Sequence, residues 1–212
     1  MKSEERVPHS LCKFNKKLIM TMTAEEYSNT EVSRKLISEK YLDPYKDSIF
    51  YLLKCKASRS KGALLEQVYS EYMIKKGVIV HRAESTQHDR IIYENDGSVQ
   101  FWESRVVLEN GKKIEIKGSF GWVITTGKRK GEISGFTFQQ LRDQDYDYIV
   151  FVYVWPDRIE FYEASKKDLC NVIFETDENG VQIHAQHGGK GKNKDTFWLT
   201  GFPSDFPWMK QI

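Results

Sequence analysis

A carboxylate and an ammonium alternate with isoleucines in the run Lys113–Ser119. Successive side chains of a strand point to opposite faces, so Glu115 and Lys117 share one face and the isoleucines take the other. Asp89 stands at the entry to an earlier apolar run. Two carboxylates are hard oxygen ligands for a divalent cation, and a lysine beside them is a point charge suited to a phosphate oxygen. These residue types outline a site that hydrolyses phosphodiesters.

The identity of the first carboxylate stays open at the level of the sequence. Asp89 precedes an apolar strand, where a polar side chain can stay accessible while the sheet fixes its backbone. Asp96 lies in an Asn-Asp-Gly turn, where the turn itself explains the aspartate and no catalytic role is needed. Glu103 lies within an apolar run. The Glu-x-Lys pattern alone is also common on the solvated face of an antiparallel sheet. The order of elements along the chain is therefore needed to interpret it.

The residue types also indicate which cation such a site would use. A phosphodiester repels hydroxide, so its hydrolysis needs a cation that neutralises the phosphate and lowers the pKa of bound water. Carboxylates and waters suit Mg²⁺, with Mn²⁺ as a substitute, whereas thiolates do not. The three cysteines are scattered and form no CxxC pair, which argues against a disulfide framework and a zinc knuckle. We expect Cys55 and Cys170 to lie in the core.

Composition sets the size and class of the protein. A chain of 212 residues that is 40% hydrophobic can form one domain with a sizeable core. Lys and Arg total 32 against 30 Asp and Glu, so any argument for a polyanionic partner has to come from local patches. No apolar run approaches the roughly 18 residues of a membrane span, and the cysteine usage suits a reducing compartment. We expect a cytoplasmic protein with no membrane association.

The first quarter of the chain is predicted to be helical. Thr23-Ala-Glu-Glu26 has the form of a capping box, and apolar residues at helical spacing follow it. Two short helices could include a DNA-reading helix-turn-helix, although most such pairs are packing units. A longer helix is predicted to begin at Ser58 or Ser60 and to end at Gly77, with Leu65 on its apolar face and Glu66 at the edge of that face.

An antiparallel meander and a parallel unit are predicted to follow. The expected strands are Val78–Val80, Arg90–Tyr93, Val99–Leu108 and Lys113–Ser119, separated by Asp-Gly and Asn-Gly turns that favour hairpins. A flexible basic loop at Gly121–Gly135 and a short helix at Phe136–Gln144 lead to Tyr148–Val154, which is apolar enough to be buried on both faces. A strand, a crossover helix and a second strand make a parallel pair. Arg158–Tyr162 and a short helix at Ser165–Asn171 come next.

This order of elements, with its acidic residues and Glu-x-Lys pair, resembles the PD-(D/E)XK nuclease superfamily over roughly residues 58 to 163. Type II restriction endonucleases are the members of this size that the chain is most similar to. The resemblance implies an α/β (α+β) fold with the core order αβββαβ, in which helices flank a mixed central sheet. It divides the chain into a helical N-terminal segment packed on the core (1–57), the nuclease core (58–172) and a basic, aromatic C-terminal extension of the same domain (173–212).

The resemblance also assigns roles to individual residues. Asp89 matches the first carboxylate, Glu115 and Lys117 match the (D/E)xK pair, and Asp89 and Glu115 would hold the metal. Glu66 matches the catalytic helical glutamate that many members add. Either Gln139 or Gln140 matches a polar residue of the following helix. The chain departs from the family at His88, which stands where the family has its proline.

A nuclease of this kind implies double-stranded DNA as the partner and a homodimer for cutting both strands of a symmetric site. The residues expected to contact DNA are Lys128, Arg129, Lys130, Gln140, Lys190, Lys192 and Lys194. The lysines after position 189 lie in a glycine-rich stretch that lacks the GxxxxGK[ST] pattern of a phosphate-binding loop, and a mobile surface loop is the alternative for it.

Three other functions remain open. A repair or junction nuclease of the same fold would recognise DNA shape, and a non-catalytic nucleic-acid-binding module would keep the fold without the chemistry. His184-x-x-His187 followed by Asn193 faintly resembles a His/Asn nuclease finger, although no cysteine supports a structural zinc.

Overall fold

A computed structural model of the chain describes residues 28–35, 43–84, 88–93, 100–102, 105–107, 111–179 and 197–212. The chain forms two compact units, Met1–Asp43 and Pro44–Ile212. In the first unit residues 31–35 are helical, and the backbone N–H of Ser33 donates to the hydroxyl of Thr30 at 3.1 Å. The predicted capping box at residues 23–26 lies outside the described residues.

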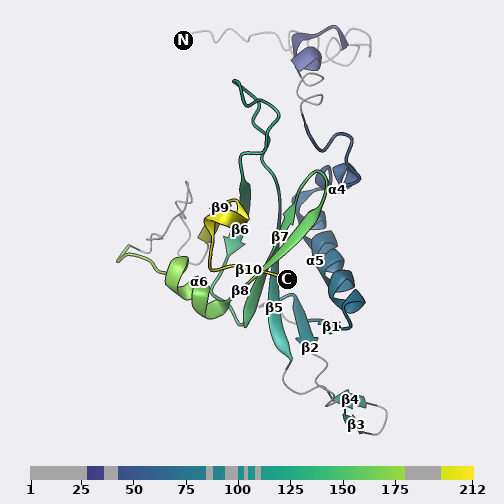
Figure 1. The fold of residues 1–212 in the computed structure, drawn as a ribbon, viewed down its shortest axis with the longest axis vertical. Coiled ribbons are helices and arrows are strands. Elements are labelled where there is room, and N and C mark those ends of the chain that lie inside the picture. The colour runs from purple at the N-terminus through teal and green to yellow at the C-terminus, as the bar shows by residue number, and fades with distance from the viewer. Residues whose placement is uncertain are drawn as a thin grey trace, which may run out of the picture. The chain divides into compact units, whose positions relative to one another are not determined.

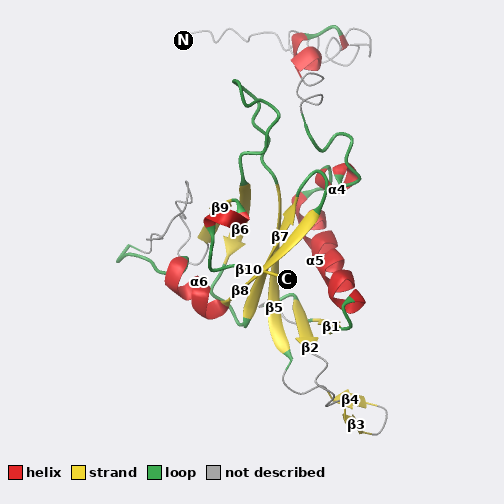
Figure 2. Ribbon diagram, in the orientation of Figure 1, coloured by secondary structure: helices red, strands yellow, loops and turns green. Residues whose placement is uncertain are grey.

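A six-stranded sheet organises the second unit (Figure 1). Its order is β1 (Ile79–Arg82), β2 (Arg90–Tyr93), β5 (Lys112–Phe120), β7 (Tyr148–Val154), β8 (Ile159–Ser165) and β10 (Lys210–Gln211). β5 and β7 are parallel and every other neighbouring pair is antiparallel. The fold is therefore mixed α+β, with a mostly antiparallel central sheet and a few helices. Figure 2 colours the helices red and the strands yellow.

The central strand β7 is buried on both of its faces, as its apolar run predicts. Val150, Val152 and Val154 pack under the helix α5 (Ser58–Lys75), whereas Ile149, Phe151 and Tyr153 belong to a second core on the opposite face. The elements that cover this second face are β6 (Phe136–Leu141), β9 (Phe197–Gly201), α6 (Lys166–Val172) and the 3₁₀ turn Pro203–Asp205.

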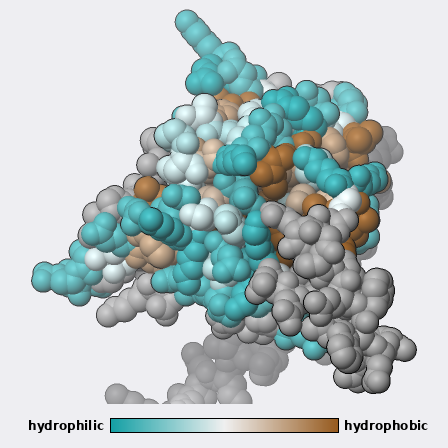
Figure 3. Space-filling model, turned by 60° about the horizontal axis from the view of Figure 1, so that its bottom comes forward, coloured by the Kyte–Doolittle hydropathy of each residue, from teal (hydrophilic) through white to brown (hydrophobic). Residues whose placement is uncertain are grey.

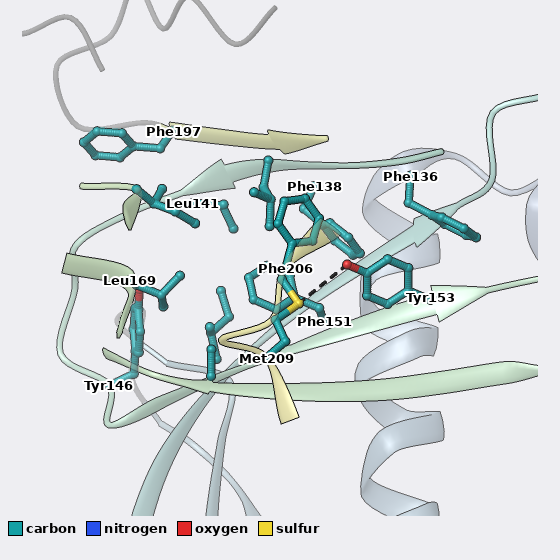
Figure 4. Close-up of a cluster of buried hydrophobic side chains, with 14 residues drawn as sticks. Phe136, Phe138, Leu141, Tyr146, Phe151, Tyr153, Leu169, Phe197, Phe206 and Met209 are labelled. Carbon is teal, nitrogen blue, oxygen red and sulfur yellow. Dashed lines mark hydrogen bonds between the residues drawn. The ribbon is translucent and has the colours of Figure 1, made fainter. Parts of the chain in front are cut away.

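Aromatic rings fill the second core (Figure 4). Phe138 packs edge-on against Phe151 and Tyr153, with ring centroids 4.9 and 4.8 Å apart. The Tyr153 hydroxyl lies 3.6 Å from the sulfur of Met209, near the C-terminus. On the face drawn in Figure 3, most of the described surface is hydrophilic, and the apolar residues that reach it form separate patches.

Helix α5 confirms the predicted extent of the helix between residues 58 and 77, but the predicted N-cap is wrong. Leu65 and Tyr69 are buried, and Gly77 follows the helix at φ +84°, a conformation that favours glycine. The N-cap is Ala57, which offers no side-chain acceptor, so Ser58 and Ser60 lie inside the helix rather than capping it. The short helix α4 (Tyr51–Lys54) precedes it. Neither α4 nor any other described helix is both long and apolar enough to cross a membrane.

The predicted helix at Phe136–Gln144 is wrong, because this segment forms the strand β6 and pairs with β9. Phe138 and Leu141 are three residues apart, a spacing that suggested a helix. A β-bulge between them shifts the alternation, so that both are buried on the same side of a strand. The expected αβββαβ order is therefore not reproduced, since a strand stands where its second helix was expected.

The predicted strand Val99–Leu108 is also wrong. It is divided into β3 (Gln100–Trp102) and β4 (Arg105–Val107), which pair with each other in a separate two-stranded sheet. In the sequence a polar Glu-Ser pair interrupts the apolar run at the division. As a consequence β2 and β5 are direct neighbours in the main sheet.

Three smaller predictions have different outcomes. The short helix after residue 165 is confirmed as α6, where the Ser165 side chain and Asp168 form a capping box. Cys55 and Cys170 are exposed rather than core residues. The segment 121–135, predicted to be a flexible loop, has paired arms joined by a bridge between Val123 and Ile133.

Candidate active site

A polar cavity of about 200 Å³ opens beside the carboxylates that the sequence singled out. Its lining residues are His88, Asp89, Glu115, Lys117, Gln140, Arg142 and Gln144. The structure thus brings together residues from the entry of β2, the middle of β5 and the end of β6. Asp96 and Glu103, the alternatives for the first carboxylate, lie outside the residues whose side chains are described.

Asp89 is positioned by the point at which β2 separates from β5. The two strands pair as far as Arg90 and Ile114, and the backbone N–H of Asp89 donates to the Ile114 carbonyl at 2.9 Å. Beyond this point the Asp89 carboxylate takes the place of a strand neighbour and accepts the backbone N–H of Ile116 at 2.8 Å. The side chain is thereby held beside the segment of β5 that contains Glu115.

Glu115 is a buried carboxylate, with only 7% of its surface exposed. Burial raises its pKa to about 6; the nearby ammonium of Lys117 opposes this shift, and the charges of Asp89 and Glu66 add to it. Lys117 forms an ion pair with the Glu115 carboxylate. The two side chains therefore lie in the arrangement that strand alternation predicts, but in a largely buried site instead of on a solvated face.

Glu66 reaches the site from helix α5 without lining the cavity. Its carboxylate accepts a hydrogen bond from Arg90 at 3.2 Å, and the same guanidinium donates to the Ser70 hydroxyl at 2.8 Å. Burial, followed by the charge of Asp89, raises the pKa of Glu66. The Arg90 guanidinium partly compensates the charge of Glu66, and its attraction opposes the rise in the pKa of that carboxyl.

The cavity is also lined by residues to which the sequence assigned no role in the site. Gln140 was expected to contact DNA, but Arg142, Gln144 and His88 were not assigned a role in the site. His88 is buried, and its Nδ1 lies 2.9 Å from the carbonyl oxygen of Asp145. Positions 140, 142 and 144 are two residues apart, so interpreting this segment as extended would have placed them on one face. Gln139 does not line the cavity.

Gln140 has a backbone conformation that non-glycine residues rarely adopt. Its φ is +58°, and among the described residues no other non-glycine residue has a positive φ. The residue lies at the β-bulge of β6, where the extra residue redirects the side chains that follow it. The bulge thus places Gln140 on the cavity wall while Phe138 and Leu141 stay in the core.

The donor set suits a hard cation that keeps part of its water shell. Asp89 and Glu115 offer carboxylate oxygens, and Mg²⁺ commonly binds through one or two carboxylates with waters completing an octahedron. In the part of the chain that the structure describes, no three His, Cys, Asp or Glu side chains gather closely enough for an all-protein metal site. The residues present therefore fit Mg²⁺ better than zinc, which prefers nitrogen and sulfur ligands.

The basic residues expected to contact DNA fall in two places. Lys128, Arg129 and Lys130 are exposed, and they lie midway along the segment 121–135, where its two arms are joined. Lys190, Lys192 and Lys194 lie outside the described residues, as do His184, His187 and Asn193.

No protein-family model matches this chain, and no curated protein matches it. Among solved structures, a bacterial homing endonuclease aligns over 72% of this chain and 86% of its own chain, with a TM-score of 0.39 and 14% sequence identity. A likeness at this level carries no argument about function, which has to be inferred from the site itself.

Proposed function

We propose that this protein is a magnesium-dependent DNA endonuclease of the type II restriction kind, which hydrolyses phosphodiester bonds of double-stranded DNA at a specific site. The observation that carries the proposal is that the Asp89 and Glu115 carboxylates and the Lys117 ammonium line one cavity. This combination of charges suits a phosphodiester and a cation together.

The burial of Glu115 is difficult to explain by solubility or stability. A Glu-x-Lys pair on a solvated sheet face would be exposed, whereas Glu115 is buried and its raised pKa shows that its charged form is disfavoured in the fold. Groups with such perturbed pKa values that lie together in a cleft are candidates for catalysis. The cavity therefore supports an enzyme over a binding module that has its carboxylates on the outside.

Asp89 and Glu115 are the residues that would hold Mg²⁺, with Mn²⁺ as a substitute. When bound, the cation would neutralise phosphate charge and lower the pKa of a water molecule. Lys117 exchanges part of its ion pair with Glu115 for a nonbridging phosphate oxygen, or orients the attacking water. Gln140 and Arg142 supply donors for the phosphate. The proposed chemistry is direct attack by water on the phosphorus, with no covalent intermediate.

Cutting both strands of a symmetric site would use a homodimer, with one cavity for each strand. Sedimentation of the protein with and without a DNA duplex would test this part separately.

The test of the proposed function is plasmid cleavage by the wild-type chain and by Glu115→Ala in the presence of Mg²⁺. We expect Glu115→Ala to abolish cleavage and to leave DNA binding intact or stronger, because it removes a metal ligand and a negative charge near the phosphate. Lys117→Met should also be inactive. Lys113→Met is the matched control, since Lys113 lies on the same strand but pairs with Asp145 at 2.8 Å, outside the cavity.

The outcomes separate the alternatives. Glu115→Ala that cuts at the wild-type rate would show that the site is wrongly assigned. Preference for branched or single-stranded substrates over plasmid would favour a repair or junction nuclease. Tight DNA binding with no Mg²⁺-dependent cleavage by the wild type would favour a non-catalytic module.

A further inference from the structure

Residues 121–135 form a two-stranded antiparallel ribbon, called the ribbon below. Its arms are joined by four backbone hydrogen bonds of 2.8 Å each, from Trp122 N to Gly135 O, Ser134 N to Trp122 O, Ile124 N to Glu132 O and Gly131 N to Ile124 O. Figure 1 shows it as the teal trace that projects beyond the end of β5. A segment with this many internal hydrogen bonds has a defined shape, which a flexible loop would lack.

The base of the ribbon is fixed to the core at the end of β5. Its first arm continues directly from β5, the strand of Glu115 and Lys117. The backbone N–H of Gly121 donates to the buried Tyr45 hydroxyl at 2.8 Å, and this hydroxyl donates to the carbonyl of Val154 at the end of β7. A Cβ at Gly121 would lie 2.6 Å from the Ile133 side chain, so the two arms are closely packed here. The direction of the ribbon is therefore set by the sheet.

The tip of the ribbon is cationic and exposed. Gly127 and Gly131, at φ +78° and +93°, permit the turn that presents Lys128, Arg129 and Lys130. Arg129 Nε lies 2.8 Å from the Glu132 carboxylate, an exposed ion pair of the kind that contributes little to stability. It engages one of the five donors of the guanidinium and orients the planar group.

We propose that the ribbon enters the major groove of double-stranded DNA and that Arg129 reads base edges there, which makes it a specificity-determining residue. This inference rests on the proposed function. The major groove of B-DNA admits either an α-helix or a two-stranded β-ribbon, and an arginine fork recognises guanine through two parallel hydrogen bonds. The deep, narrow major groove of an RNA duplex would not admit the ribbon.

The connection to β5 also limits where the contacted bases lie. From Lys117 to Lys128 the chain reaches at most about 36 Å at roughly 3.3 Å per residue. That length is about one helical turn of DNA. The bases read by the ribbon should therefore lie within about one turn of the phosphate that is cut.

The test uses three variants of the full chain. In the first, an Asn-Gly pair replaces residues 125–131 and joins Ile124 to Glu132. These two residues face each other across the ribbon, and a two-residue Asn-Gly turn is the usual connection between strands paired in this way. The second and third are Arg129→Ala and Arg129→Lys. The lysine variant keeps the charge for phosphate contacts but loses the bidentate fork. Random-sequence duplexes are digested with Mg²⁺ and the cut ends are sequenced, and the duplexes bound without Mg²⁺ are sequenced as well.

We expect the shortened ribbon to lose the sequence preference of the wild type at positions within one turn of the cut, while the remaining cleavage still depends on Mg²⁺. Arg129→Lys should lower discrimination at one base pair by about 10- to 100-fold. Arg129→Ala should lower the same discrimination by at least as much, because it removes the fork altogether. Equal binding to an RNA duplex, or an unchanged preference in the shortened variant, would overturn the inference.

Failure of the proposed function is distinguishable from failure of the inference. If no protein cuts any substrate, the proposed function fails, and the sequences of the bound duplexes still test the ribbon. Loss of the enriched sequences in the shortened variant would then support groove reading. Each Arg129 variant is compared with the wild type. If the variants show only a uniform loss of affinity across all sequences, the ribbon contacts phosphates alone and the inference is wrong.

Discussion

The carboxylate of Asp89 accepts the backbone N–H of Ile116 at 2.8 Å. This bond joins the entry of β2 to the middle of β5 at the position between Glu115 and Lys117, where the two strands no longer pair. Asp89 thus has a structural task, which is to satisfy a backbone donor, and a position from which its charge acts on Glu115. The two roles can be separated by substitutions that keep one and remove the other.

Asp89→Asn should keep the fold and lose the activity. The asparagine carbonyl can still accept the Ile116 N–H, so we expect the thermal midpoint to change little. Loss of a charged metal ligand should lower Mg²⁺-dependent cleavage by at least about a hundredfold. Plasmid cleavage rates and thermal unfolding of the same preparations would measure both effects.

Asp89→Ala and Asp96→Asn are the controls for this prediction. Asp89→Ala removes the acceptor as well, and an unsatisfied backbone donor should cost about 1–3 kcal/mol of unfolding free energy. Asp96→Asn should change cleavage little. The reverse pattern, with Asp96→Asn inactive and Asp89→Asn active, would assign the first metal carboxylate to Asp96.

Glu115→Gln should stabilise the protein at neutral pH in the absence of metal. The pKa of Glu115 is raised from 4.5 to about 6, so the folded state favours its protonated form. The stabilisation from this group is complete below pH 4.5 and is lost as pH rises through about 6. A shift of this size corresponds to about 2 kcal/mol, and it already includes the attraction of Lys117. Glutamine mimics the protonated form and is insensitive to pH.

Urea unfolding of both proteins at pH 4.5 and pH 7.5, in EDTA, would measure this effect. We expect the glutamine variant to gain about 2 kcal/mol relative to wild type between the two pH values, and Mg²⁺ to stabilise only the wild type at pH 7.5. A stability difference that stays the same at both pH values would mean that Glu115 ionises as freely in the fold as in the unfolded chain.

The extent to which the sequence predicts this site depends on which interactions are local. Glu115 and Lys117 could be paired from strand alternation, and the double burial of β7 could be predicted from its uninterrupted apolar run. The closeness of Asp89 and Glu115 could not be predicted in this way, because it requires β2 and β5 to be neighbours. They are neighbours because β3 and β4 pair with each other in a separate sheet. That choice is made by long-range pairing, which local patterns do not encode.

The part of the cavity lined by Arg142 and Gln144 was missed for a different reason. The bulge of β6 gives Phe138 and Leu141 a spacing of three residues, which is typical of a helix, and local periodicity cannot distinguish the two structures over so short a segment. Pairing with β9, a strand more than fifty residues later in the chain, determines the outcome. Arg142 and Gln144 were consequently not recognised as lining residues.

Tyr69→Phe should be neutral or stabilising. The Tyr69 hydroxyl is buried, and no hydrogen-bond partner for it occurs among the residues that the structure describes. A buried hydroxyl that forms no hydrogen bond has lost its hydration without compensation. Removal should therefore raise the free energy of unfolding by up to about 1 kcal/mol, measured by urea unfolding. A loss of more than about 1 kcal/mol would reveal a partner for this hydroxyl, such as one of the residues beyond the described part of the chain.

Gly118→Ala should destabilise the protein, because Gly118 lets helix α5 pack directly on β5 beside Lys117. A Cβ at this position would lie 2.2 Å from Leu65 Cδ1 and 3.3 Å from Leu65 Cβ and Cγ. Leu65 is buried, with 1% of its surface exposed, so it cannot turn away without displacing other core side chains. We expect a loss of about 1–3 kcal/mol in unfolding free energy and a lower cleavage rate, since Lys117 is the adjacent residue.

A double-mutant cycle with Leu65→Ala tests the contact itself. Leu65→Ala alone should cost about 2–5 kcal/mol, as is usual for a buried leucine. In the double variant the new methyl group occupies part of the space that Leu65 vacates, so the combined loss should be smaller than the sum of the single losses by about 1 kcal/mol or more. Gly62→Ala is the matched control, because a Cβ there meets no atom within 4 Å, and it should be neutral or slightly stabilising within α5. Losses that add within about 0.5 kcal/mol would mean that α5 and β5 do not meet at Gly118 and Leu65.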